Sequence, residues 1–275
     1  MDAWTIAAKD LRLQTRDRRA FFVLLVLPLV FITVIGMSTR RLADVGPADV
    51  APSGAGTAPD SPSGTTAAAA SDDEQRRAVY RTIVPSFTVL FAFFLINIMA
   101  RSFIAEREIG TLRRLRMAPV TTTSLLVGKT LPFFILSVCQ CLTLLILGHV
   151  VYGMPIGNAP WLLLPVTICT SLAATSLGLL VATTVRTDSQ VSAYANLIVI
   201  GLAGISGCFL PRSWLPNMAQ TVSLATPHAW CLIGYDEVLR AVQPQPAKVG
   251  GCCAVLMLFT LVFFATGCRR FRRLG

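Results

Sequence analysis

The sequence predicts an all-α integral membrane protein with six transmembrane helices, on three observations. Of its 275 residues, 54% are hydrophobic and only 14% are charged, whereas about a quarter of the residues are charged in ordinary soluble domains. Uncharged windows of about 20 residues, long enough for a helix to cross a bilayer, recur along the chain. The net charge of +10 lies between these windows, which argues against a soluble enzyme and against a nucleic-acid-binding protein.

Six uncharged windows are predicted to span the membrane. They occupy residues 20–39, 82–100, 131–152, 161–185, 191–210 and 249–268. The first is rich in Val, Leu, Ile and Phe, whose favourable transfer into the bilayer outweighs the presence of Pro28. The second lies between Arg81 and Arg101. The uncharged stretch 130–185 is too long for one crossing, and the Gly, Pro and Asn residues of 153–160 divide it into the third and fourth spans.

The distribution of charge predicts the orientation. With six crossings, residues 1–19, residues 101–129, the turn at Arg186 and the basic C-terminal tail share one face of the membrane, and the whole positive excess falls there. Because basic loops stay in the cytoplasm, both termini of this multi-pass protein are expected on the cytoplasmic side of the plasma membrane. A seventh crossing within 211–240 would move the tail outside, so we expect a broken re-entrant or interfacial helical pair there, facing the outer side.

Two segments outside the spans have distinctive compositions. In residues 1–19, Trp4 and Leu11 recur at helical spacing among basic residues, which predicts a helix along the inner membrane face. This segment lacks the apolar core of a secretory signal and is expected to remain in the mature protein. Residues 42–79 are predicted to be a disordered outer loop, because 46–71 is almost entirely Ala, Pro, Ser, Gly, Thr and Asp and cannot bury enough apolar surface to fold. The whole chain is expected to form one transmembrane domain.

Residues 101–129 form the only substantial polar segment between two predicted cytoplasmic span ends. A short helix is expected there, with an apolar strip beside arginines and an end at Pro119. The strip comprises Ile109, Leu112, Leu115 and Met117. We expect a soluble protein to dock on this segment, and a solvated, positively charged loop is an equal alternative on charge alone.

Two motifs resemble those of type-2 ATP-binding-cassette (ABC) transporter permeases. The first is similar to the family's E-x-G-T-L-x-x-L-x-x-x-P segment and comprises Glu106, Arg107, Glu108, Gly110, Thr111, Leu112, Leu115 and Pro119, followed by Gly128 and Lys129. The second is similar to the outer re-entrant segment and comprises Ser206, Gly207, Phe209, Pro211, Leu215, Pro216, Pro227, His228, Trp230 and Leu239. With the six-span plan, the resemblance extends over nearly the whole chain except 46–71. It looks most like the drug and antibiotic exporter branch.

The resemblance implies a function. In that family the cytoplasmic segment forms a coupling helix in a cleft of a separate ATPase subunit, which would make the docking residues here Glu106, Glu108, Gly110, Thr111, Leu112, Leu115 and Pro119. The chain would be the permease subunit of an exporter of lipophilic or amphipathic molecules, paired with a second permease half. ATP and Mg²⁺ would bind to the partner ATPase, and no cofactor to this chain. The alternatives are a permease for lipid, glycolipid or polysaccharide export and a membrane sensor without transport.

The chain carries little enzymatic chemistry of its own. ATP hydrolysis would require G-x-x-x-x-G-K-[ST] after a strand, so that backbone amides can cradle the phosphates. Gly128, Lys129 and Thr130 give only the end of this pattern, and position 123 is Thr. The ATPase is therefore expected on another chain, and no catalytic residue or metal site is assigned to this one. Because no predicted span contains Asp, Glu, Lys or Arg, an ion-coupled carrier is disfavoured.

Polar and thiol groups in or near the spans have more than one interpretation. Three amides either hydrogen-bond across helices, which is favoured, or contact substrate: Asn97, Gln140 and Asn196. Ser206 and His228 resemble the nucleophile and base of an intramembrane serine protease of the rhomboid type, a further alternative. Cys208 and Cys231 both fall near the predicted outer face and could form a disulfide, although buried free thiols are the default.

Overall fold

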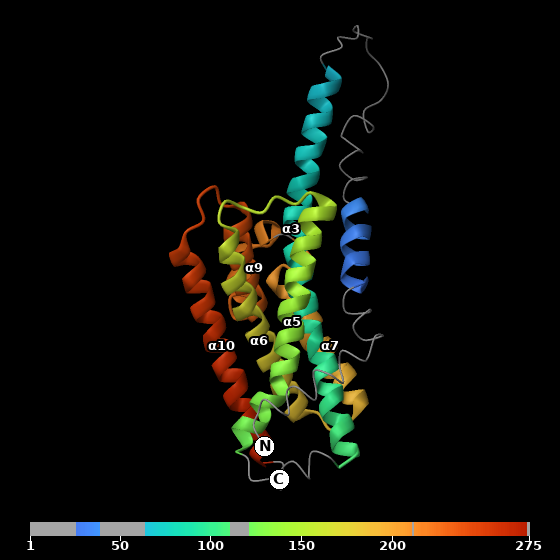
Figure 1. The fold of residues 1–275 in the computed structure, drawn as a ribbon, viewed down its shortest axis with the longest axis vertical. Coiled ribbons are helices and arrows are strands. Elements are labelled where there is room, and N and C mark those ends of the chain that lie inside the picture. The colour runs from blue at the N-terminus through green and yellow to red at the C-terminus, as the bar shows by residue number, and fades with distance from the viewer. Residues whose placement is uncertain (1–25, 39–63, 111–120, 211, 274–275) are drawn as a thin grey trace.

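The computed structural model describes residues 26–38, 64–110, 121–210 and 212–273. Every regular element in these ranges is helical, which confirms the all-α class. The long helices run side by side along the longest axis of the molecule (Figure 1). The elements are the helix Val26–Ser38, α3 (Gly64–Glu108), α5 (Thr122–Tyr152), η2 (Pro160–Leu162), α6 (Leu163–Thr184), α7 (Asp188–Ser206), η3 (Arg212–Trp214), α8 (Asn217–Ser223), α9 (Pro227–Arg240) and α10 (Pro246–Arg273).

Within the described ranges, five helices are long and apolar enough to cross a membrane. They are Arg77–Glu108 of α3, then α5, Pro160–Thr184 with α6, α7 and α10. Of the first predicted span, only the short helix Val26–Ser38 is described, so the count of six spans stays a prediction. The predicted interfacial helix at 1–19 lies outside the described residues, as do residues 42–63 of the predicted outer loop.

The prediction of a disordered loop is wrong for residues 64–79, because α3 begins at Gly64 and continues unbroken into the membrane part of the helix. Ala67–Ala70 have the highest helix propensity of any residue. Extending an existing helix also avoids the unfavourable nucleation step. Composition predicted only that this stretch could not form a core, and a helix that continues a transmembrane span does not need one.

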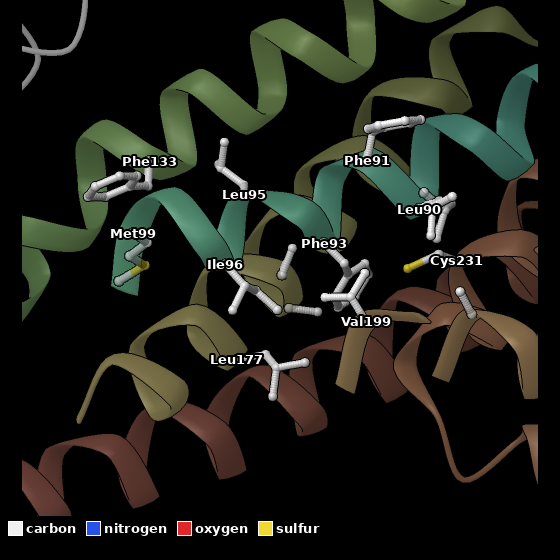
Figure 2. Close-up of a cluster of buried hydrophobic side chains, with 14 of the residues drawn as sticks. Leu90, Phe91, Phe93, Leu95, Ile96, Met99, Phe133, Leu177, Val199 and Cys231 are labelled. Carbon is white, nitrogen blue, oxygen red and sulfur yellow. The ribbon is translucent and has the colours of Figure 1, made fainter. Parts of the chain in front are cut away.

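The core of the bundle lies between α3 and α6. Figure 2 shows Phe93, Ile96 and Met99 of α3 close to Leu177 of α6, and all four are buried. α6 also packs against α10, α5 and α9. Gly178 allows the close approach to α3, since a Cβ there would lie 2.9 Å from the sulfur of Met99. Close packing through small residues is the usual way in which membrane helices associate.

The segment predicted as a broken helical pair is indeed interrupted. α8 ends at Ser223, and α9 begins at Pro227 with Thr226 as its N-cap, whose side chain accepts a hydrogen bond from the Ala229 amide at 3.4 Å. α9 packs against α3, α6 and α10 and so inserts into the bundle. It lies toward the end of the bundle opposite to the C-terminus (Figure 1). Which side of the membrane this end faces stays a prediction.

Candidate functional site

The C-terminal end of α3 and the N-terminal end of α5 lie side by side and flank residues 111–120 (Figure 1). An ion pair between Glu106 and Lys129 joins the two helices. The Lys129 side chain is 3% exposed, and its Nζ atom lies 5.7 Å from the centre of the Phe103 ring. A buried charge requires a partner, because the protein interior solvates it poorly. The pair therefore holds the two helix ends in one arrangement.

Gly110 ends α3 in a left-handed conformation. Its φ is 76°, and its amide donates to the Arg107 carbonyl at 3.2 Å. A Cβ at this position would meet no atom within 4 Å, so glycine is required by backbone conformation and not by lack of space. Next to it, Glu108 and Ile109 are exposed, and 76% of Ile109 is accessible. The turn thus presents one acidic and one apolar side chain beside the segment expected to dock.

The docking residues predicted from the sequence divide into two groups. Glu106, Glu108 and Gly110 are described, and they lie together at the end of α3. Thr111, Leu112, Leu115 and Pro119 lie outside the described residues, so the coupling helix itself stays a prediction. On the far side, α5 begins with Thr121 as N-cap, which accepts a hydrogen bond from the Ser124 amide at 3.2 Å.

Polar contacts at the same end connect α3 to other helices. Arg101 Nη1 lies 2.7 Å from Asp188 Oδ2, and Arg101 Nη2 donates to Ser192 Oγ at 2.7 Å, which links α3 to α7. Arg107 Nη1 donates to the Val185 carbonyl at 3.4 Å, at the turn between α6 and α7. The sequence analysis used Arg101 only as a span boundary and assigned no contact to Asp188. Their opposite signs at two span ends on the same face were a signal that could have predicted this contact.

The three amides within the spans are placed as follows. Asn97 Nδ2 of α3 donates to Asn196 Oδ1 of α7 at 3.2 Å. Gln140 of α5 is 4% exposed. Hydrogen bonds between helices are a common use of such residues in membranes. The Asn97–Asn196 bond therefore gives this pair a packing contact, on the same two helices that the Arg101–Asp188 pair connects.

The structure does not bring Ser206 and His228 together as a protease would need. Ser206 Oγ donates to the Ala203 carbonyl at 3.2 Å and lies 3.6 Å from the Cys208 sulfur. His228 is fully buried and stacks on Phe93, with ring centres 3.8 Å apart. Its two ring nitrogens have no hydrogen-bond partner among the described residues. A histidine that is not bonded to the serine does not activate it as a general base.

The structure places the other predicted residues of the second motif as follows. Trp230 Nε1 donates to the Leu224 carbonyl at 2.8 Å and so closes the turn between α8 and α9. Pro227 is buried, whereas Phe209 and Pro216 are exposed. Pro211 lies outside the described residues. Cys208 and Cys231 are buried free thiols, so the structure contains no disulfide between them.

Curated relatives of the chain are transport proteins by name. The linearmycin resistance permease protein LnrN of Bacillus subtilis (strain 168) is 29% identical over 186 residues, which are 68% of this chain and 48% of that protein. The probable multidrug ABC transporter permease YbhR of Escherichia coli (strain K12) is 27% identical over 148 residues, 53% of this chain and 40% of that protein. The inner membrane transport permease YhhJ of Escherichia coli (strain K12) is 30% identical over 128 residues, 46% of this chain and 34% of that protein.

The chain spans about a third to a half of the length of these relatives. The model of one family, described as ABC-2 type transporter, matches residues 1–239. This match includes both motifs of the sequence and the helices that carry them, from α3 to α9. Because it covers well over half of the chain, the protein belongs to the ABC-2 type transporter family.

Proposed function

We propose that this chain is the membrane-spanning permease subunit of an ABC exporter that moves lipophilic or amphipathic molecules, drugs and antibiotics among them, out of the cell. The observation that carries the proposal is the buried Glu106–Lys129 pair, which joins the two helices on either side of the predicted docking segment. The family match supports the transporter class. The names of two relatives, a linearmycin resistance permease and a probable multidrug permease, support the drug and antibiotic branch.

In this proposal the driving force enters through residues 109–119. ATP and Mg²⁺ bind to a separate ATPase subunit, and this chain carries no cofactor. Movement of the docked ATPase pushes on the end of α3, and the Glu106–Lys129 pair passes the displacement to α5. The Arg101–Asp188 pair passes it to α7. Packed helices joined by ion pairs move as units, so a small shift at one end becomes a tilt along the bundle.

A second permease half completes the proposed transporter. α7 and α10 are the least covered of the candidate spans, with 28% and 22% of their most apolar windows buried in this chain. Apolar helix faces of this kind are covered by lipid or by another membrane helix. The proposed location is the plasma membrane, with both termini in the cytoplasm and α8 and α9 at the outer side.

Export can be tested by measuring the accumulation of a lipophilic fluorescent dye in cells that lack their major efflux pumps. Cells expressing this chain with its ATPase are expected to accumulate less dye than cells with the ATPase alone. Replacing exposed Ile109 by Glu should restore accumulation, because a charge at the docking surface weakens the contact with the ATPase. Val242→Glu is the matched control, since Val242 is 80% exposed and lies between α9 and α10. Unchanged dye levels together with altered envelope glycolipid would favour the lipid or glycolipid exporter instead.

A further inference from the structure

A cavity of about 390 Å³ opens among α3, η3, α8 and α9, at the opposite end of the bundle from the Glu106–Lys129 pair. Three arginines line it, Arg81, Arg212 and Arg240, together with Asp236 and Glu237. Cavities of a few hundred Å³ with convergent polar groups are the usual form of small-molecule sites. None of these five residues belongs to the predicted docking segment, so the cavity is independent of ATPase docking.

The two acidic residues of the cavity are already engaged. Asp236 Oδ1 lies 2.6 Å from Arg240 Nε. The Glu237 carboxylate accepts a hydrogen bond from the backbone amide of Gln245 at 3.1 Å and lies 3.8 Å from the amino group of Lys248. Asp236 also stabilises the charge of Arg212 at longer range. With Lys248 beside Glu237, the basic groups around the cavity outnumber the acidic ones.

Two guanidinium nitrogens at the cavity are buried without an acceptor. Arg81 Nε and Arg212 Nη1 have no hydrogen-bond partner among the residues that the structure describes. Among the described residues, Arg212 Nη2 donates to a neutral group, the backbone carbonyl of Gln220, at 3.1 Å. A buried donor without an acceptor is unfavourable, and an arginine fork matches the paired oxygens of a phosphate or a carboxylate.

The backbone holds Arg212 in this position. Gly207 ends α7 with a φ of 93°, and the chain turns there into η3. A Cβ on Gly207 would lie 2.8 Å from Cγ of Arg212. Only glycine therefore lets the stem of Arg212 pass so close to the end of α7.

Part of the remaining wall of the cavity is apolar, beside the polar residues Thr82, Ser86 and Gln220. The apolar part consists of Pro85 of α3 and Leu232 and Ile233 of α9. Arg81 and Thr82 stand at the boundary where α3 changes from a polar to an apolar sequence. A site that combines arginines with apolar side chains matches a molecule that has an anionic group at one end and a hydrocarbon portion at the other.

We infer that this cavity binds the phosphate or carboxylate group of an anionic amphiphile, with Arg81 and Arg212 as the direct ligands. Such a molecule comes either from the membrane, as an anionic phospholipid, or from solution, as a single-chain amphiphile. Both carry paired anionic oxygens for the arginines, and both would place their hydrocarbon portion against Leu232 and Ile233. Neither the site nor its test depends on the proposed transport activity.

The test is native mass spectrometry of the full-length chain released from detergent micelles. Dioleoylphosphatidylglycerol should be retained in preference to dioleoylphosphatidylcholine. Arg81→Gln and Arg212→Gln should each weaken phosphatidylglycerol binding about tenfold, the loss expected for one charge-assisted hydrogen bond. Arg186→Gln, an exposed arginine at the other end of the bundle, is the matched control and should bind as the wild type does. Equal retention of the two lipids, or unchanged binding by both cavity variants, would overturn the inference.

Two further probes identify the source of the ligand. If decanoate displaces phosphatidylglycerol from the wild type but not from Arg81→Gln, the site accepts a soluble amphiphile; if it displaces none, the site is a lipid site. Inorganic phosphate that competes as well as decanoate would contradict a role for the apolar wall.

Arg212→Gln also removes the bond to Gln220 and can disturb α8. Arg81→Gln keeps the test decisive in that case, because no hydrogen bond of Arg81 Nε is lost.

Discussion

At one end of the bundle Lys129 is 3% exposed and paired with Glu106, whereas at the other end Lys248 is 60% exposed and lies 3.8 Å from Glu237. The first pair is enclosed by packed helices and joins α3 to α5. In the second pair the lysine reaches solvent, although the Glu237 side chain is 17% exposed. This pair lies beside a cavity in which Arg81 and Arg212 each have an unpaired donor among the described residues. In our proposals the same two residue types therefore serve different purposes: the buried pair transmits movement between helices, and the other end of the bundle offers positive charge to a ligand.

The largest effect is expected from Lys129→Met. This variant leaves Glu106 without its partner at a largely buried site, which typically destabilises a protein by about 3 kcal/mol or more. Lys248→Met should change the free energy of unfolding by less than about 1 kcal/mol, because exposed pairs contribute little. Thermal unfolding in detergent measures both. Equal losses of unfolding free energy in the two variants would show that the two ion pairs contribute equally to stability, which would contradict the comparison.

The double variant Glu106→Gln, Lys129→Met sharpens the same comparison. It removes both charges, so it should recover much of the stability that Lys129→Met loses. Coupled transport should nevertheless stay impaired, since the link between α3 and α5 is gone. Recovery of both stability and transport would show that the pair stabilises the fold without transmitting motion.

An intermediate effect is expected from two of the three described glycines that end helices in the left-handed conformation. Gly110 has a φ of 76° and Gly153 a φ of 66°, and no atom lies within 4 Å of a Cβ at either position. Alanine should therefore cost about 1 to 2 kcal/mol at each. Only Gly110→Ala should also lower ATPase-coupled transport, because Gly153 lies at the other end of α5. A similar transport defect in Gly153→Ala would point to general destabilisation.

The smallest effect concerns Asn97 and Asn196. Their hydrogen bond should contribute about 0.6 kcal/mol in a double-mutant cycle with alanine, as is usual between membrane helices. Substrate preference in the dye assay should not change, because the bond serves packing. A shift in substrate preference in either single variant, larger than its effect on stability, would place the pair in the transport pathway.

Sequence reasoning was most accurate where strong signals bound a helix on both sides. The fourth span was expected at 161–185, and the structure has a helix, η2 with α6, at 160–184, because the Gly and Pro residues of 153–160 and the charge of Arg186 limit where a helix can begin and end. That this helix crosses the membrane stays a prediction. The ends of α3 and α5 were predicted less well. α5 begins at Thr122 and not at 131. The predicted span started after Lys129 because a charged residue was taken as its boundary, but within the fold Glu106 pairs with Lys129, and the helix includes it.

The sequence proposed a set of site residues, whose role stays a prediction, and it did not predict the contacts among them. The family motif contained both Glu106 and Lys129, yet no spacing along the chain shows that they meet. Arg81 was used only as the boundary of the second predicted span, and Arg212 was not considered as a site residue. Their shared cavity depends on the turn at Gly207 and on the insertion of α9 into the bundle. Such contacts between distant segments follow from tertiary packing, which local patterns do not determine.

The most direct test of coupling through the α3–α5 end is to purify the tagged chain from its native membrane in mild detergent and to identify the proteins present in stoichiometric amount. We predict a nucleotide-binding ATPase with the wild type and with Val242→Glu, and its loss with Ile109→Glu while the variant remains folded and inserted. Retention of the ATPase by Ile109→Glu, or its absence from a wild-type preparation that is intact, would contradict docking at this end of the bundle.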